Sequence, residues 1–189
     1  MAKRIVLGGL AGGVVLFVWG AISHMVLPLG EVGIKVMPNE QPVIAAMREN
    51  LREPGFYFFP GGGHDMTPEQ QQAWAEEYQR GPNGILIYHP TGSEPLSPTQ
   101  LLTELLANIA AALVVAFLLG QAAGALAGYG AKVLFVALLG LLPGLDVDVS
   151  YWNWYGFPGD YTLAVIADHV IGWLVVGLVL AAIITRPAS

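Results

Sequence analysis

Residues 161–185, YTLAVIADHVIGWLVVGLVLAAIIT, form an apolar segment that contains Asp168 and His169. A helix rises ~1.5 Å per residue, so about 20 apolar residues suffice to cross the hydrocarbon core of a bilayer. Ionisable side chains inside such a helix are costly, and they usually face the interior of a bundle or a water-filled cavity. The segment therefore predicts a transmembrane helix whose Asp-His pair has polar neighbours on other helices.

Three other segments of the chain are apolar enough to span a membrane. The first, residues 1–27, opens with Lys3 and Arg4, and its apolar run is longer than the ~7–15 residues of a signal-peptide core. We therefore expect a retained helix, with small residues at four-residue spacing that suit close packing. The second and third segments are residues 98–120 and 131–145. The sequence predicts a four-helix membrane protein.

The connection between the second and third helices is rich in glycine. The spacing leaves open whether the second helix breaks near Gly120 or near Gly128, and we place the turn near Gly128, with Lys132 reaching the membrane interface. Gly140 and Pro143 then predict that the third helix is tilted, kinked or short.

Residues 28–97 form a polar insertion between the first and second helices, with nine of the fourteen acidic residues of the chain. Apolar spacing predicts a helix over 38–51. N-cap chemistry at Thr67 and Pro68, with Gln70 three positions on, predicts a helix over 67–80. Aromatic or β-branched runs predict strands over 55–60 and 84–89. This small α/β insertion has few residues for a core of its own. We expect it to pack on the membrane helices or on a partner protein.

The basic residues predict the orientation of the four helices. Lys3, Arg4, Lys132 and Arg186 flank one side of the predicted membrane region, and the positive-inside rule makes that side cytoplasmic. Both termini are then cytoplasmic and residues 28–97 lie outside, with a bacterial inner membrane as the expected location.

An aromatic segment, residues 146–160, connects the third and fourth helices. It reads as an outer loop, and Trp152, Trp154 and Tyr155 are expected to anchor it at the level of the lipid headgroups. Asp146 and Asp148 beside it read as a solvated acidic turn.

Four ionisable side chains are predicted at one depth in the bilayer. His24, Glu104, Asp168 and His169 each fall within ~4–12 Å of the outer interface when depth is counted along the helices. Asn108 lies one helical turn deeper than Glu104 and on the same face. The shared depth on three helices predicts a polar cluster of these five residues.

Three interpretations of the polar cluster remain open. The side chains can be interhelical hydrogen-bonding partners with no further role. They can bind a metal, or His24 and His169 can hold a haem, which makes the protein a membrane redox protein. They can also begin a proton or ion path, and a transporter of this kind needs polar groups that continue past Asn108.

Several functional classes are disfavoured by composition. The net charge is −6 and no basic stripe is present, which argues against nucleic-acid binding. The chain has no cysteine, and we find no hydrolase, zinc-protease or paired-carboxylate motif. A non-catalytic accessory subunit of a membrane complex fits best, because the insertion is small and the glycine and alanine faces exceed what four helices need internally. The same features are compatible with self-association of this protein. The partner, the oligomeric state and any substrate stay open.

Overall fold

The computed structural model describes residues 1–184, and the predicted helix end at Thr185 and the basic Arg186 lie outside the described residues. The chain forms two units. One contains residues 1–34 together with the chain from residue 96 onward, and the other contains residues 35–95. Each unit is described by itself.

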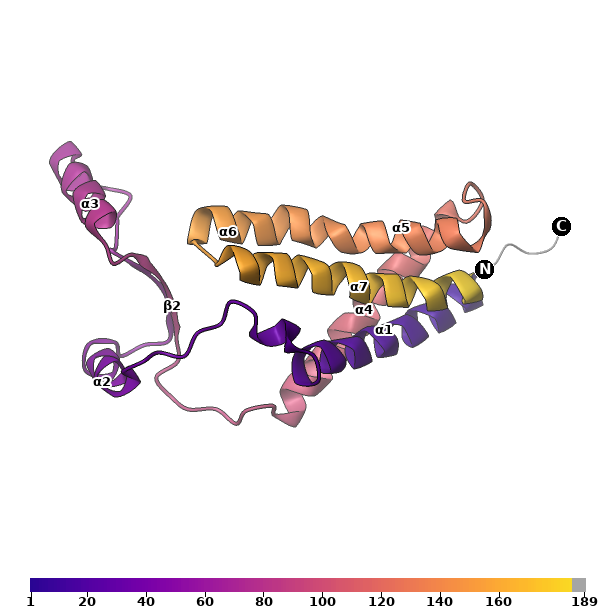
Figure 1. The fold of residues 1–189 in the computed structure, drawn as a ribbon, viewed down its shortest axis with the longest axis horizontal. Coiled ribbons are helices and arrows are strands. Elements are labelled where there is room, and N and C mark those ends of the chain that lie inside the picture. The colour runs from indigo at the N-terminus through magenta and orange to yellow at the C-terminus, as the bar shows by residue number, and fades with distance from the viewer. Residues whose placement is uncertain (185–189) are drawn as a thin grey trace. The chain divides into compact units, whose positions relative to one another are not determined.

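Four helices of the first unit are long and apolar enough to cross a membrane. Figure 1 shows them as the elongated bundle, in which α1 packs on α4 and α7, and α5 pairs with α7. Their bounds are Ala2–Met25 for α1, Pro98–Ala122 for α4, Gly128–Tyr155 for the third helix, which begins with α5 (Gly128–Pro143), and Gly159–Ile183 for α7.

The third helix is longer than the sequence predicted. It continues from α5 through a π-helical turn, Gly144–Asp148, into α6, Val149–Tyr155, so most of the predicted loop 146–160 is helical. Proline lacks an N–H and clashes with the carbonyl four residues before it, which made Pro143 a predicted break. Here a π-helical turn, which is wider than an α-helical one, directly follows Pro143. This local switch from α-helical to π-helical geometry lets the helix continue. Residues 156–158 alone connect α6 to α7.

The turn between α4 and α5 lies slightly earlier than predicted. Helix α4 ends at Ala122, and Gly128, with a φ of +84°, is already the first residue of α5. The break between the helices therefore falls between Gly120 and Gly128, the two positions that the sequence left open. Lys132 does not reach outward as expected: it is 8% exposed, and its Nζ donates a 2.9 Å hydrogen bond to the Ile184 carbonyl. The final carbonyls of a helix lack partners within it, so an inward lysine satisfies one of them.

The glycines of α1 bring this helix unusually close to its neighbours. A Cβ at Gly9 would lie 2.8 Å from the Leu113 Cα, and one at Gly13 would lie 2.4 Å from the Ile109 Cα, both on α4. Gly8 and Gly12 instead face α7. The small-residue face that the sequence predicted is thus used inside the unit. An excess of small residues on α1 is no longer a reason to expect a partner.

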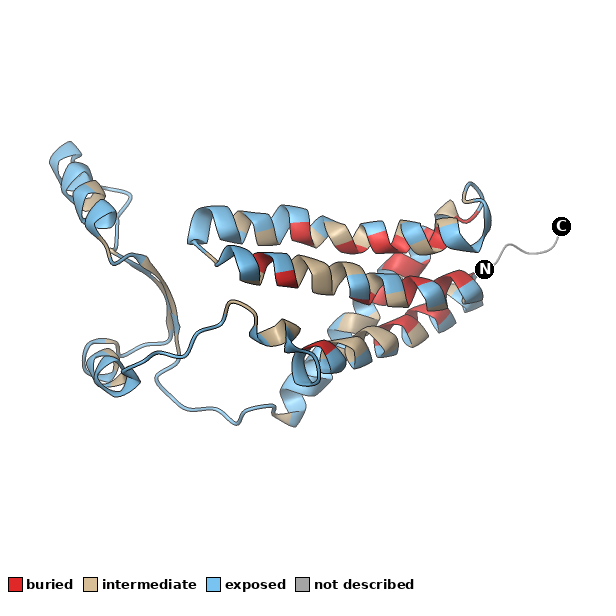
Figure 2. Cartoon of the chain, viewed as in Figure 1, coloured by how far each residue is buried: buried red, intermediate tan, exposed pale blue. Residues whose placement is uncertain are grey.

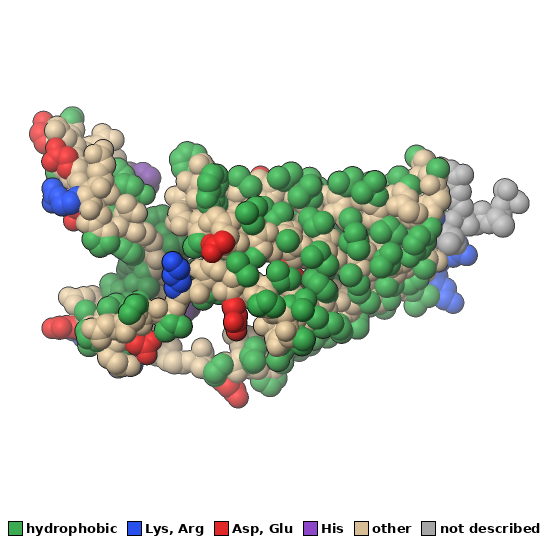
Figure 3. Space-filling model, viewed as in Figure 1, with side chains coloured by type: hydrophobic (Ala, Val, Ile, Leu, Met, Phe, Trp, Pro, Cys, Tyr) green, Lys and Arg blue, Asp and Glu red, His purple; other side chains and the backbone are tan. Residues whose placement is uncertain are grey.

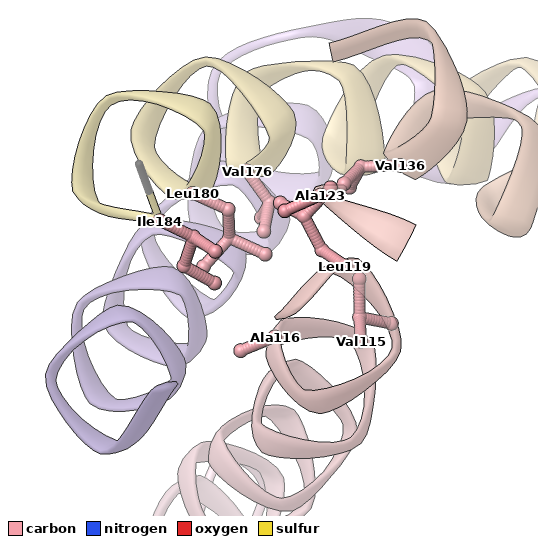
Figure 4. Close-up of a cluster of buried hydrophobic side chains, with 8 residues drawn as sticks. All are labelled: Val115, Ala116, Leu119, Ala123, Val136, Val176, Leu180 and Ile184. Atoms are coloured by element: carbon pink, nitrogen blue, oxygen red, sulfur yellow. The ribbon is translucent and has the colours of Figure 1, made fainter. Parts of the chain in front are cut away.

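The apolar core fills one end of the helical unit, where α1 begins and α7 ends. Figure 4 shows its side chains pointing toward one another from α4, α5, α7 and the turn after α4, and Figure 2 shows buried residues concentrated at this end. The cluster comprises Val115, Ala116, Leu119, Ala123, Val136, Val176, Leu180 and Ile184.

The second unit contains two helices and two strands, α2 Glu40–Asn50, β1 Gly55–Phe59, α3 Pro68–Arg80 and β2 Gly84–Tyr88. The strands pair antiparallel with Tyr57 opposite Leu86. A capping box of Thr67 and Gln70 begins α3, as the sequence predicted. The predicted insertion began at residue 28, whereas residues 28–34 pack with the helical unit.

All residues from 35 to 95 are described, and none of them is buried (Figure 2). Neither helix packs extensively on the two-stranded sheet. One link is the Trp74 Nε1, which donates a 3.1 Å hydrogen bond to the Pro60 carbonyl at the end of β1. The second unit therefore has regular secondary structure without a closed hydrophobic core.

Candidate functional site

The five residues of the predicted polar cluster line one cavity of about 540 Å³ in the helical unit. His24 comes from α1, Glu104 and Asn108 from α4, and Asp168 and His169 from α7. The cavity lies at the end of the bundle opposite the apolar core, where α1 ends and where α4 and α7 begin. The structure brings the cluster together, and its role as a functional site stays a prediction.

Asp168 is fixed by a tryptophan on another helix. The Trp19 Nε1 donates a 2.8 Å hydrogen bond to the Asp168 Oδ1, which joins α1 to α7. The two helices approach closely here because Gly172, one turn after Asp168, packs directly under the Trp19 ring. A hydrogen bond to a carboxylate is stronger than one between neutral groups, so this contact orients Asp168 within the cavity.

Glu104 and Asn108 form a pair along one face of α4. The Asn108 Nδ2 donates a 3.1 Å hydrogen bond to the Glu104 Oε1. Residues four apart on a helix are neighbours, so the sequence spacing predicted this proximity. The amide leaves the other oxygen of Glu104 without a hydrogen bond among residues 1–184.

His24 is held against the end of its own helix. Its Nδ1 lies 2.8 Å from the Ser23 Oγ and 3.1 Å from the Gly20 carbonyl oxygen. The 3₁₀ turn η1, Pro28–Glu31, folds back over the ring, and a Cβ at Gly30 would lie 2.7 Å from the His24 Cδ2. Glycine at this position therefore allows the chain after α1 to pass close to His24, whose side chain stays exposed.

His169 has a partner that the sequence did not identify. Its Nε2 lies 3.4 Å from the Asp148 Oδ2, and this oxygen is covered and has no hydrogen-bond partner among the described residues. Asp146 and Asp148 were expected to form a solvated turn, but the π-helical turn exposes Asp146 and turns Asp148 toward α7. The contact becomes an ion pair when His169 is protonated.

Trp19 and Asp148 are the polar partners that sequence reasoning missed. Trp19 reads as an ordinary apolar residue of a membrane helix, and its partner is 149 positions away in the chain. Asp148 follows Pro143, which signalled the end of a helix. The one sequence feature that could have predicted the Trp19–Asp168 contact is Trp19 itself, because an indole N–H needs a hydrogen-bond acceptor when it is buried.

The predicted interface anchors lie on a helix rather than in a loop. Trp152, Trp154 and Tyr155 are on α6 and are 52%, 76% and 37% exposed. The rings of Tyr151 and Tyr155 are tilted by 53° to each other with centroids 5.4 Å apart, as expected for neighbours one helical turn apart. Their exposure is compatible with an interfacial position.

Metal binding and ion conduction are less well matched by the geometry of the cavity. Among residues 1–184, no three His, Asp or Glu side chains are close enough to share a metal ion. The bundle beyond the cavity is filled by the apolar cluster around Leu119 and Leu180. A second, shallower hollow of about 190 Å³ between α1 and Val175 is lined by apolar residues and Trp19.

Comparison with protein-family models, with curated proteins and with solved structures found no match to this chain.

Proposed function

We propose that this protein is a non-catalytic integral membrane subunit, and that a partner protein binds its second unit, residues 35–95. The observation that supports this proposal is the lack of any buried residue in that unit. An isolated two-stranded sheet is marginally stable in water, and it needs further strands or a packed helix to become independent. A partner that covers the sheet supplies the missing core.

One face of the sheet is suited to such a partner. Phe56 pairs with Ile87 across the strands, and Phe58 pairs with Ile85 on the same face. Phe56, Phe58 and Ile87 are 50%, 51% and 64% exposed. Burial of apolar surface contributes about 25 cal/mol per Å², so covering these side chains stabilises both the unit and the complex.

The helical unit supports a position in the membrane. Large aliphatic side chains are exposed along all four helices, among them Val14, Val114, Leu138 and Leu163. Figure 3 shows the visible side of this unit covered by hydrophobic side chains. In the proposed orientation the end with Lys3 and Arg4 is cytoplasmic, and residues 35–95 are outside.

The other two functions considered from the sequence receive less support. A transporter formed by this chain alone needs a polar path past Asn108, where the apolar cluster instead packs. A metal centre with three protein ligands lacks support, because no group of three His, Asp or Glu side chains gathers within residues 1–184.

The proposal is tested with the full chain extracted from its native cells in a mild detergent. We expect native electrophoresis to show the protein in a complex larger than the chain itself. Ile87→Glu places a charge on the exposed sheet face and should release the protein from the complex. Val43→Glu, an equally drastic change at an exposed residue of α2, should leave the complex intact.

Two results contradict the proposal. One is a wild-type protein that migrates at the mass of a single chain under every mild extraction. The other is an Ile87→Glu protein that stays in the complex. Thermal unfolding of both variants, followed by helical circular dichroism, checks that the four-helix unit remains folded.

A further inference from the structure

We propose that the cavity between α1, α4 and α7 is a binding site for a small organic ammonium ion. The proposal is independent of the partner protein and rests on the cavity's charge, walls and size. Its volume of about 540 Å³ lies within the range of about 300–1,000 Å³ that is usual for small-molecule sites.

The charge of the cavity selects a cation. Glu104 and Asp168 line it, and the lining residues within 1–184 include neither lysine nor arginine. His24 and His169 also line the cavity, and they carry no charge when neutral. Two carboxylates without a lysine or arginine beside them repel an anionic ligand. A cation that enters the cavity gains charge-assisted contacts with both.

The two carboxylates are held so that each keeps an oxygen for a ligand. Trp19 occupies the Oδ1 of Asp168, and Asn108 occupies the Oε1 of Glu104. The second oxygen of each carboxylate has no hydrogen bond within the described part of the chain. Neutral donors on both carboxylates fix their orientation without cancelling their charge. Such preorganisation lowers the cost of binding.

The walls of the cavity favour an organic cation over a metal ion. Trp19, Trp173 and Tyr161 line it, and the faces of such rings attract ammonium groups. Leu16, Leu29 and Val165 add apolar surface that suits carbon-bound substituents. A bare divalent ion needs several converging ligands, and no group of three gathers in residues 1–184. The combination of carboxylates and aromatic walls matches an ammonium ion with carbon substituents.

The cavity ends inside the bundle, which makes it a binding site rather than a passage. Ala111 is the last residue of α4 that lines the cavity. The next buried residues of α4 are Ala112 and Val115, and Val115 belongs to the apolar core. A ligand therefore enters and leaves the cavity at the end of the bundle where α1 ends and η1 begins. The α1–η1 turn, with Gly30 over His24, borders this entrance.

Isothermal titration calorimetry of the full chain in a non-ionic detergent tests the proposal. Choline is compared with 3,3-dimethylbutan-1-ol, which has the same shape but no charge, and butylammonium is compared with butan-1-ol. We expect at least one ammonium ion to bind more tightly than its neutral counterpart by about tenfold or more, because a hydrogen bond to a charged group contributes more than one between neutral groups.

Asp168→Asn and Glu104→Gln remove the charges and keep the shape and the hydrogen bonds to Trp19 and Asn108. Each should weaken ammonium binding about tenfold, a change that corresponds to the loss of one charged contact. Asp146→Asn, at an exposed carboxylate outside the cavity, should bind as the wild type does.

The proposal is overturned if neither ammonium ion binds more tightly than its neutral counterpart. It is also overturned if Asp168→Asn and Glu104→Gln bind as tightly as Asp146→Asn. Should Asp168→Asn fail to fold, Glu104→Gln decides alone, because Glu104 is exposed and its replacement leaves the helix contacts in place.

Discussion

The close approach of α1 and α4 gives a prediction whose size follows from the structure. Gly13 packs on the backbone of Ile109, and a Cβ added there would lie 2.4 Å from its Cα and 2.7 Å from its N. A backbone cannot rotate away as a side chain does, so Gly13→Ala must move α1 from α4. Overpacking of this kind costs about 1–3 kcal/mol.

A glycine on the same helix serves as the matched control. Gly20 has no atom within 4 Å of the position that a Cβ would occupy. Both replacements gain the same intrinsic helix propensity, about 1 kcal/mol in water. The difference in stability between Gly13→Ala and Gly20→Ala therefore isolates the close contact, and we expect Gly13→Ala to be less stable by about 1–3 kcal/mol.

Reversible unfolding in a mixed micelle of dodecyl maltoside and increasing sodium dodecyl sulfate measures this difference by circular dichroism. Equal stability of the two variants, or a more stable Gly13→Ala, would refute the packing of α1 on α4. A lower stability of Gly20→Ala than of the wild type would show that another surface covers this glycine.

Two further predictions concern helix ends. Lys132→Met keeps the length of the side chain but removes the hydrogen bond to the Ile184 carbonyl, and it should lower the unfolding free energy by about 1 kcal/mol in the same assay. Thr67→Ala removes the cap of α3, which should speed amide exchange in its first turn. The backbone N–H and the Thr67 hydroxyl lower the pKa of Glu69, so in wild type this carboxylate stabilises α3 above its unfolded pKa and ceases to do so as pH falls through the lowered value. A nuclear magnetic resonance titration should show the Glu69 pKa rising toward its ordinary value in Thr67→Ala, and an unchanged pKa would contradict the cap.

The helices of this protein follow from local properties of the sequence. Long apolar runs predict four spans, and proline and serine or threonine mark where α3 and α4 begin. The count of residues from each helix end also placed His24, Glu104 and Asp168 at one level, since a helix rises by a constant amount per residue. The cavity that they line is the structural consequence of that shared level.

The partners within the site could not be obtained in the same way. Which faces of two helices meet depends on tertiary packing, and the contact of Trp19 with Asp168 depends on Gly172 lying beneath the indole. The contact of Asp148 with His169 could not be predicted without knowing that the helix continues past Pro143 through a π-helical turn. This turn changes the direction of the side chains that follow it.

The fold of the second unit shows another limit of sequence reasoning. Strands 55–59 and 84–88 were readable from their aromatic and branched residues, but their register depends on the pairing itself. The expectation that this segment is too small for a core agrees with the absence of buried residues between 35 and 95. What covers it in the cell is the subject of the proposed function.

We propose that the four-helix bundle spans a membrane and that its cavity is accessible to water from the outer side. The chain has no cysteine, so a single cysteine can report the exposure of one position. Ala111 lines the cavity and Ala116, on the same helix, is 0% exposed in the core. In intact cells, a membrane-impermeant cationic thiosulfonate should modify Ala111→Cys and leave Ala116→Cys unmodified. If Ala111→Cys reacts only in inside-out vesicles, or reacts no faster than Ala116→Cys, the account is wrong.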